Sequence, residues 1–329
     1  MKTSALWLAA AVGLLLFQPE IHAQSFNKAG RASFQFLRIG IGARQTAMGE
    51  AGLSVVQDVN SIFWNPAGVT GIASTEASFS YNRWFADMNY VAAAAAVQWS
   101  GVGVIGASFA NLGYGDIPEA LATTESGSSD TRTGQTFTGS DLMAGITFAR
   151  QFTDNLSIGV TAKYLREKLF IYSVSTYAFD VGTFYDTKFK GIKFAMSAQN
   201  FGKAVEFLSV GSRLEGYDIP LLFSIGASVD VISPKEAFFN AGESQLLTLA
   251  VETVNSNDYG ERWHIGAEYG FMDFLFLRGG YRFNYDDGNV SFGAGLRKKF
   301  GDLDLRVDYS YVSYEFLSSP QRISLTIGF

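Results

Sequence analysis

The chain has 329 residues and a formal net charge of −6 at pH 7, with 17% charged and 15% aromatic residues. It has no cysteine, which excludes disulfides, and no run of Lys and Arg, which argues against nucleic acid as a partner. After residue 23 no stretch approaches 18 consecutive apolar residues, which argues strongly against transmembrane helices. The charged fraction is below the roughly 25% that is usual for soluble domains, and the chain has 35 glycines.

Residues 1–23 have the pattern of a secretory signal peptide. A positive start precedes the apolar run 5–17, and Ala23 offers a small residue before a cleavage site at Gln24. The apolar run is too short to span a bilayer, and its flanks suit cleavage. We therefore expect an exported protein whose mature chain starts near Gln24; a buried N-terminal strand or helix is the alternative.

Residues 24–75 carry no clear strand pattern and hold two short helical pieces, at about Gln45–Glu50 and Asp58–Phe63. The second piece runs into a Trp-Asn-Pro-Ala-Gly break. Proline disfavours the helical region for the residue before it, and glycine tolerates a positive φ, so we expect a sharp turn there. The residues assigned to this break are Phe63, Trp64, Asn65, Pro66 and Gly68.

From residue 76 onward the chain alternates with period two. In residues 302–313, aliphatic and aromatic side chains alternate with charged ones, as they do on a strand with one apolar face. Fourteen strands are predicted, at 76–84, 90–99, 102–110, 140–149, 156–166, 176–186, 191–200, 220–231, 245–254, 261–270, 273–284, 289–299, 302–313 and 320–329.

Two architectures share this alternation, a soluble sandwich and an outer-membrane barrel. Segments of about ten residues suit tilted bilayer-crossing strands. Short Phe-x-Asp turns are predicted at one end of the barrel, and the long connections 111–139 and 201–219 at the other. Outer-membrane barrels likewise have short periplasmic turns and longer external loops. The connection 232–244 is an exception, because it is long and falls on the periplasmic side. An alternating last strand ending in Phe329 resembles an outer-membrane assembly signal. We therefore predict an all-β fold, a transmembrane antiparallel β-barrel of about 14 strands over residues 76–329.

A barrel of this size raises the question of what fills its lumen. About eight strands enclose a space that side chains fill, whereas 16–18 leave an aqueous channel. Residues 24–75 are the only segment long enough to occupy the lumen of a 14-stranded barrel. We therefore interpret them as an N-terminal plug, or hatch, of short helices; a helix-containing periplasmic leader is the alternative.

Charged residues on the predicted lumen face of neighbouring strands form a second candidate site. Opposite charges on adjacent strands can pair across the ladder, and unpaired buried charges are costly. We favour a salt-bridged network bracing the wall against the hatch over an ion-selectivity ring. Its predicted members are Arg278, Arg282, Arg297, Asp304, Arg306 and Asp308.

Motifs for catalysis, metal binding or cofactor binding are not recognisable. The mature chain has one histidine, His264, which we interpret as a hydrogen-bonded lumen residue. The acidic run 285–289 lacks the glutamate that a calcium loop places after it, so it predicts an Asp-Gly hairpin turn. We expect no enzyme activity, no metal and no cofactor.

Several stretches resemble one family. The stretches FLRIGIGARQTAMGEAG (36–52) and WNPAGV (64–69) resemble the start of PorV/PorQ outer-membrane proteins, and YGDIPEALATTE (114–125) and YAFDVGTFYD (177–186) are also similar to that family. This family belongs to the wider FadL-like group. The resemblance implies a 14-stranded barrel with an N-terminal hatch, located in the outer membrane of a Bacteroidota-type envelope.

The resemblance implies two functions. The first is a non-enzymatic accessory role in the type IX secretion system, in which the protein binds the C-terminal signal domain of secreted cargo or docks on the translocon barrel or a surface partner. The second is a FadL-like channel that passes hydrophobic small molecules such as fatty acids. Outer-membrane lipid is a partner under both hypotheses, and nothing in the sequence sorts the chain into the PorV or the PorQ branch.

Overall fold

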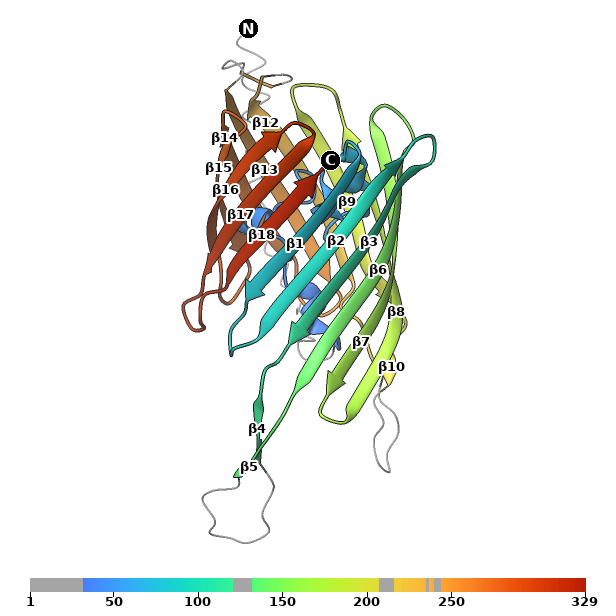
Figure 1. The fold of residues 1–329 in the computed structure, drawn as a ribbon, viewed down its shortest axis with the longest axis vertical. Helices are drawn as coiled ribbons and strands as arrows, with labels where there is room; N and C mark the ends of the chain where they lie inside the picture. Colours follow the sequence, from blue (N-terminus) through green and yellow to red (C-terminus); the bar gives the residue numbers. More distant parts are fainter. Residues whose placement is uncertain (1–31, 121–131, 207–215, 235–236, 240–243) are drawn as a thin grey trace, which may run out of the picture.

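The computed structural model describes residues 32–120, 132–206, 216–234, 237–239 and 244–329, so the predicted signal peptide 1–23 lies outside the described residues. Fourteen antiparallel strands close into one barrel, in which β1 pairs with both β2 and β18 (Figure 1). The barrel strands are β1 (Thr75–Arg83), β2 (Asn89–Trp99), β3 (Gly103–Gly113), β6 (Gly139–Gln151), β7 (Leu156–Leu169), β8 (Tyr172–Asp186), β9 (Ile192–Gly202), β12 (Leu222–Ile232), β13 (Gln245–Ser256), β14 (Arg262–Phe271), β15 (Leu275–Phe283), β16 (Val290–Phe300), β17 (Leu303–Ser313) and β18 (Gln321–Gly328). All fourteen predicted strands are confirmed, including the alanine-rich β2.

The two ends of the barrel differ in their connections. At the long-loop end, the β3–β6 connection forms a hairpin of β4 (Ile117–Ala120) and β5 (Arg132–Phe137) that projects beyond the rim (Figure 1). The β9–β12 connection at this end holds β10 (Val205–Glu206) and β11 (Gly216–Tyr217). At the short-turn end most connections are tight, and the predicted Phe-x-Asp turns lie there.

Side chains alternate between the lumen and the exterior along each strand. On β18, Arg322 and Ser324 are buried, whereas Ile323 is 53% exposed on the outer face. Large apolar side chains are exposed around the barrel, from Ile146 on β6 to Phe292 on β16. So much exposed apolar surface is unfavourable in water and is typical of a barrel surrounded by lipid. No helix among the described residues is both long enough and apolar enough to cross a bilayer.

Residues 32–74, which we call the inner segment, lie inside the barrel (blue in Figure 1). One apolar cluster joins Phe34 and Phe36 of this segment to wall residues such as Leu165, and a second joins Ile62 to Val104. Burial of these side chains holds the segment against the wall. Its helices are η1 (Gln35–Arg38), α2 (Ala43–Ala47), η2 (Val59–Phe63) and η3 (Pro66–Gly71).

The break after Phe63 differs in detail from its prediction. Asn65 is the N-cap of η3 and Pro66 its first residue, a position that suits proline because no helical N–H bond is lost. Gly68 lies within η3 and does not have a positive φ, so the part of the prediction that gave Gly68 a positive φ is wrong. A side chain at Gly68 would instead collide with the carbonyl oxygen of Val56 and with Ser61, so close packing explains this glycine.

Candidate functional site in the barrel lumen

The Asn-Pro break docks on a pair of wall glycines. Gly159 on β7 and Gly182 on β8 face each other across the ladder. A Cβ at Gly159 would collide with Pro66, and one at Gly182 with the side chain of Asn65. The Asn65 amide also donates to the carbonyl of Thr183 over 3.0 Å. Two small residues at matched positions therefore let the inner segment approach the strand backbone directly.

A second glycine pair lies elsewhere on the wall. Gly266 on β14 and Gly280 on β15 face each other, and a Cβ at either would collide with Met48; Gly280 also touches Gly49. The Gly49 N–H donates to the Ser291 hydroxyl over 2.8 Å. The inner segment is thus fixed by close backbone contact at two separate places.

Phe63 and Trp64 lie in the sequence between the residues that make these two contacts, Met48–Gly49 and Asn65–Pro66. Phe63 packs against both apolar clusters, and its carbonyl accepts a hydrogen bond from Gln199 Nε2 over 2.9 Å. Trp64 Nε1 donates to the Ile41 carbonyl over 2.9 Å, so the indole ties two parts of the inner segment together. Both side chains line a cavity on the long-loop side of the segment.

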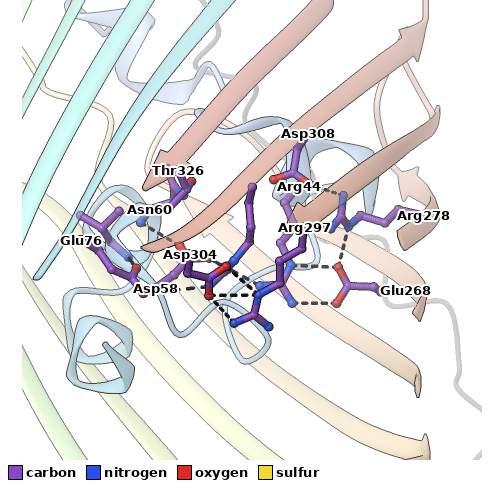
Figure 2. A network of polar contacts seen from close by, with 12 residues as sticks. Arg44, Asp58, Asn60, Glu76, Glu268, Arg278, Arg297, Asp304, Asp308 and Thr326 are labelled. Atoms are coloured by element: carbon purple, nitrogen blue, oxygen red, sulfur yellow. Dashed lines mark hydrogen bonds and ion pairs between the residues drawn. The ribbon is translucent and has the colours of Figure 1, made fainter. Parts of the chain in front are cut away.

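Ion pairs fasten the other side of the inner segment to β14–β17. Figure 2 shows Arg44 and Arg278 approaching the same carboxylate, Glu268. Arg44 Nη2 and Nε lie 2.7 and 2.9 Å from the two oxygens of Glu268, and Arg278 Nη1 lies 2.7 Å from Asp308 Oδ1. Glu268 is 1% exposed, so each arginine compensates a charge that would be costly to bury alone.

A second group of polar contacts holds the start of η2. Asp58 caps this helix by accepting from the Asn60 N–H, and its other oxygen lies 3.0 Å from Arg306 Nη1 of β17. Glu76 accepts from the Val59 N–H over 3.1 Å, and Asn60 donates to Thr326. The helix start is therefore tied to both β1 and β17–β18 (Figure 2).

The six predicted network residues fall into three groups. Arg278 and Asp308 meet in the buried cluster, and Arg306 contacts the inner segment at Asp58. Arg297 lies at the short-turn rim, where it pairs with Asp304 and with Asp273 of the β14–β15 turn. These rim contacts join wall to wall and do not touch the inner segment.

Arg282 lies apart from the others, on the long-loop side of the inner segment. Its Nη1 is 3.0 Å from Glu50 Oε1, and its other nitrogens donate to the Gly288 carbonyl. Burial alone would raise the pKa of Glu50, but Arg282, His264 and Arg322 together outweigh that effect, and the pKa is lowered. Nearby, His264 Nε2 is 2.9 Å from the Tyr285 hydroxyl, as expected for a hydrogen-bonded lumen histidine.

The inner segment separates two cavities of different character. The long-loop cavity, of about 110 Å³, has a mixed lining, with apolar residues such as Leu37 and Leu222 beside five charged ones that include Glu50 and Arg282. The short-turn cavity, of about 470 Å³, is lined largely by charged side chains, among them Arg44, Asp58 and Arg306. A molecule that crosses the barrel along its axis must therefore pass the inner segment.

Sequence reasoning missed three residues of the buried cluster, namely Arg44, Asp58 and Glu268. Glu268 could have been found, because it stands directly opposite Arg278 in the β14–β15 register. Arg44 and Asp58 could not, because their position depends on how the inner segment docks.

Several solved structures of outer-membrane barrels have a similar fold. The toluene transporter TodX of Pseudomonas putida matches with a TM-score of 0.60 and 12% identity, over 88% of this chain and 97% of that chain. The monoaromatic hydrocarbon channel CymD and a FadL homologue from Pseudomonas aeruginosa each match with a TM-score of 0.55 and 11% identity, over 88% of this chain and 98% of theirs. No protein-family model and no curated protein matches the sequence.

These matches show the fold of the FadL-family hydrocarbon channels, a closed 14-stranded barrel. At 11–12% identity they show the fold alone. None of the three is a PorV or PorQ protein or a component of type IX secretion, so that branch of the resemblance stays a prediction.

Proposed function

We propose that this protein is an outer-membrane channel for hydrophobic small molecules, in which the inner segment serves as the hatch. The observation that carries the proposal is the segment's position in the lumen, between an outward cavity of mixed apolar and charged lining and an inner cavity lined mostly by charged residues. The neighbours TodX and CymD, a toluene transporter and a monoaromatic hydrocarbon channel, support the same class of substrate.

The long-loop cavity has the composition of a site for such molecules. Phe63, Trp64 and Leu222 supply apolar surface, and Arg282 and Tyr285 are among the polar and charged residues beside it. Ligand sites commonly combine an apolar lining with a few polar groups that set orientation. Because external loops of outer-membrane barrels are the longer ones, this cavity faces the outside and receives substrate first. The hatch then has to shift before substrate reaches the inner cavity.

Uptake into proteoliposomes tests this function. We expect toluene or a fluorescent fatty acid to enter liposomes that contain the protein faster than empty ones. Leu222→Trp, which fills the long-loop cavity, is expected to abolish the difference. Phe223→Trp is the matched control, because Phe223 is the next residue and is exposed on the outer face. Uptake equal to that of empty liposomes for the unchanged protein would contradict the proposal.

A role as a type IX secretion accessory is the second candidate. The observation that favours it is the β4–β5 hairpin, which projects beyond the barrel rim where it can contact another protein (Figure 1). Affinity purification from native outer membranes separates the two functions. Co-purification of a large translocon barrel or of cargo signal domains, without uptake activity in liposomes, supports the second candidate and contradicts the first.

A further inference from the structure

A large apolar cleft lies at the long-loop end, apart from the two lumen cavities described above. It has a volume of about 830 Å³ and is formed by the β4–β5 hairpin together with the ends of β7 and β8. Its apolar lining is Phe137, Leu169, Phe170, Ile171, Tyr172 and Val174. Ile171 is 71% exposed, and the Phe137 and Phe170 rings meet edge to face at 5.6 Å. An open apolar cleft of this size at the aqueous end of a barrel is typical of a binding site.

Carboxylates surround this apolar surface. Glu119 on β4, Glu167 on β7 and Glu206 on β10 line the cleft, and no Lys or Arg is among the described residues that line it. Glu119 Oε2 accepts a hydrogen bond from the Thr133 hydroxyl over 2.7 Å, and Glu119 has no ion pair among the residues whose side chains the structure describes. Three acidic groups from three elements therefore create a negative potential over an aromatic floor.

A fourth carboxylate stands behind Glu167. Asp141 on β6 is directly opposite Glu167 in the ladder, so the two side chains share the inner face. Asp141 is 1% exposed; its Oδ2 accepts from the Tyr114 hydroxyl over 2.6 Å, while its Oδ1 has no partner among the described residues. A cation bound beside Glu167 would supply a positive charge next to two carboxylates that have no cationic partner among the described residues.

We propose that the cleft binds an amphipathic organic cation, with its ammonium group beside Glu167 and its apolar body over Phe170 and Ile171. Charge selects the occupant: an amphipathic anion would meet three carboxylates, and a neutral hydrocarbon would leave them unused. The site is separate from the lumen cavities, so the proposal goes beyond the channel function. Glu167 Oε2 also accepts the Phe34 N–H over 2.9 Å, so an occupant would contact the carboxylate that holds the start of the inner segment.

Three probes of matched shape test the proposal, namely 4-phenylbutylammonium, 4-phenylbutanol and 4-phenylbutanoate. Binding is measured calorimetrically on the full chain in nanodiscs and corrected with empty nanodiscs. We expect the ammonium compound to bind most tightly, and its affinity to fall with added salt. Glu167→Gln is expected to weaken ammonium binding about tenfold, the size of one charge-assisted contact. The glutamine oxygen can still accept from Phe34, so this variant is expected to fold.

The control is Glu315→Gln, an exposed residue of the β17–β18 connection at the same end of the barrel. Strands β1, β2, β3 and β6 lie between β18 and β7, so this residue is remote from the cleft. Ammonium binding is expected to be unchanged in the control. Equal affinity for the alcohol and the ammonium compound, an unchanged affinity in Glu167→Gln, or no binding at all would overturn the proposal. Uptake of hydrocarbons need not change in any of these cases, so the channel function is tested separately.

Discussion

The inner segment meets the barrel wall in two different ways. Against β7 and β8, Asn65 and Pro66 lie on the strand backbone at the Gly159–Gly182 pair, where shape complementarity fixes their position. Against β14–β17, the contact adds charged side chains, with Arg44 and Arg278 sharing Glu268. The first contact is short-range and sterically strict. The second adds ion pairs beside a cavity of about 470 Å³, in which water can solvate separated charges.

This difference indicates how the hatch would move. Packed backbone contacts weaken abruptly on separation, because a gap of about 0.5–1 Å already forfeits a quarter to a half of the dispersion energy. Ion pairs next to a polar cavity can separate stepwise as water replaces each partner. We therefore expect opening to begin with the ion pairs on the β14–β17 side, while the contact of Asn65 and Pro66 with the Gly159–Gly182 pair holds the segment in the barrel. The following variants test each side separately.

The largest effect is expected from Glu268→Gln. This change leaves Arg44 and Arg278 close together without their shared carboxylate, and breaking a buried pair in this way costs about 3–5 kcal/mol. Urea unfolding should show the loss of stability, and limited proteolysis should show faster cleavage of residues 32–74. Glu261→Gln, at an exposed position, is the control; equal effects in both variants would mean that the buried cluster does not hold the segment.

A smaller effect is expected from Gly280→Val. Its side chain would collide with Met48 and Gly49, and overpacking of this kind costs about 1–3 kcal/mol. The displaced segment should make the barrel permeable to small polar solutes in a liposome-swelling assay. The neighbouring Gly279→Val is a matched control, because a Cβ there meets only the Ser291 carbonyl at 3.9 Å. Leakage in both variants, or in neither, would argue against docking at the Gly266–Gly280 pair.

Asn65→Ala is expected to have a moderate effect. The variant loses the N-cap bond to the Ala67 N–H and the bond to Thr183, and loss of an N-cap typically costs about 1 kcal/mol. Asn65→Ser keeps a capping oxygen and should retain part of the stability. Unfolding in urea distinguishes the two; equal stability of the alanine and serine variants would show that the cap contributes nothing.

The smallest effect is expected from Arg297→Gln. Its partners Asp304 and Asp273 lie at the partly exposed rim, where an ion pair is worth less than about 1 kcal/mol. Because these partners belong to the wall, protease protection of residues 32–74 should stay unchanged. Faster proteolysis of the segment in this variant would mean that the rim ion pairs help to hold the inner segment, contrary to this account.

The strands could be predicted from the sequence because each carries its own period-two signal. Residues 302–313 alternate clearly, and β17 runs from Leu303 to Ser313. The inner segment has no such signal, and its helices are too short to be set by local preference. Hence α2 ends at Ala47 and not near Glu50, and the sequence did not indicate η1 and η3.

The lumen site was predictable only in part. Arg278 and Arg282 share a face, which indicated a single network. Four residues along a strand span about 13 Å, however, enough to place them on opposite sides of the inner segment. Arg282 therefore pairs with Glu50, and Arg278 with Glu268. Partners supplied by the inner segment follow from tertiary docking, which no strand pattern encodes.

A reversible crosslink between hatch and wall tests the central claim most directly. The chain has no cysteine, and Thr46 Oγ1 of α2 lies 2.8 Å from Ser310 Oγ of β17, so Thr46→Cys with Ser310→Cys places two thiols together. We predict that the oxidised pair forms a disulfide, that hydrocarbon uptake then falls to the rate of empty liposomes, and that reduction restores it. Equal uptake by the oxidised and reduced protein, or failure of the disulfide to form, would contradict a mobile hatch docked at this site.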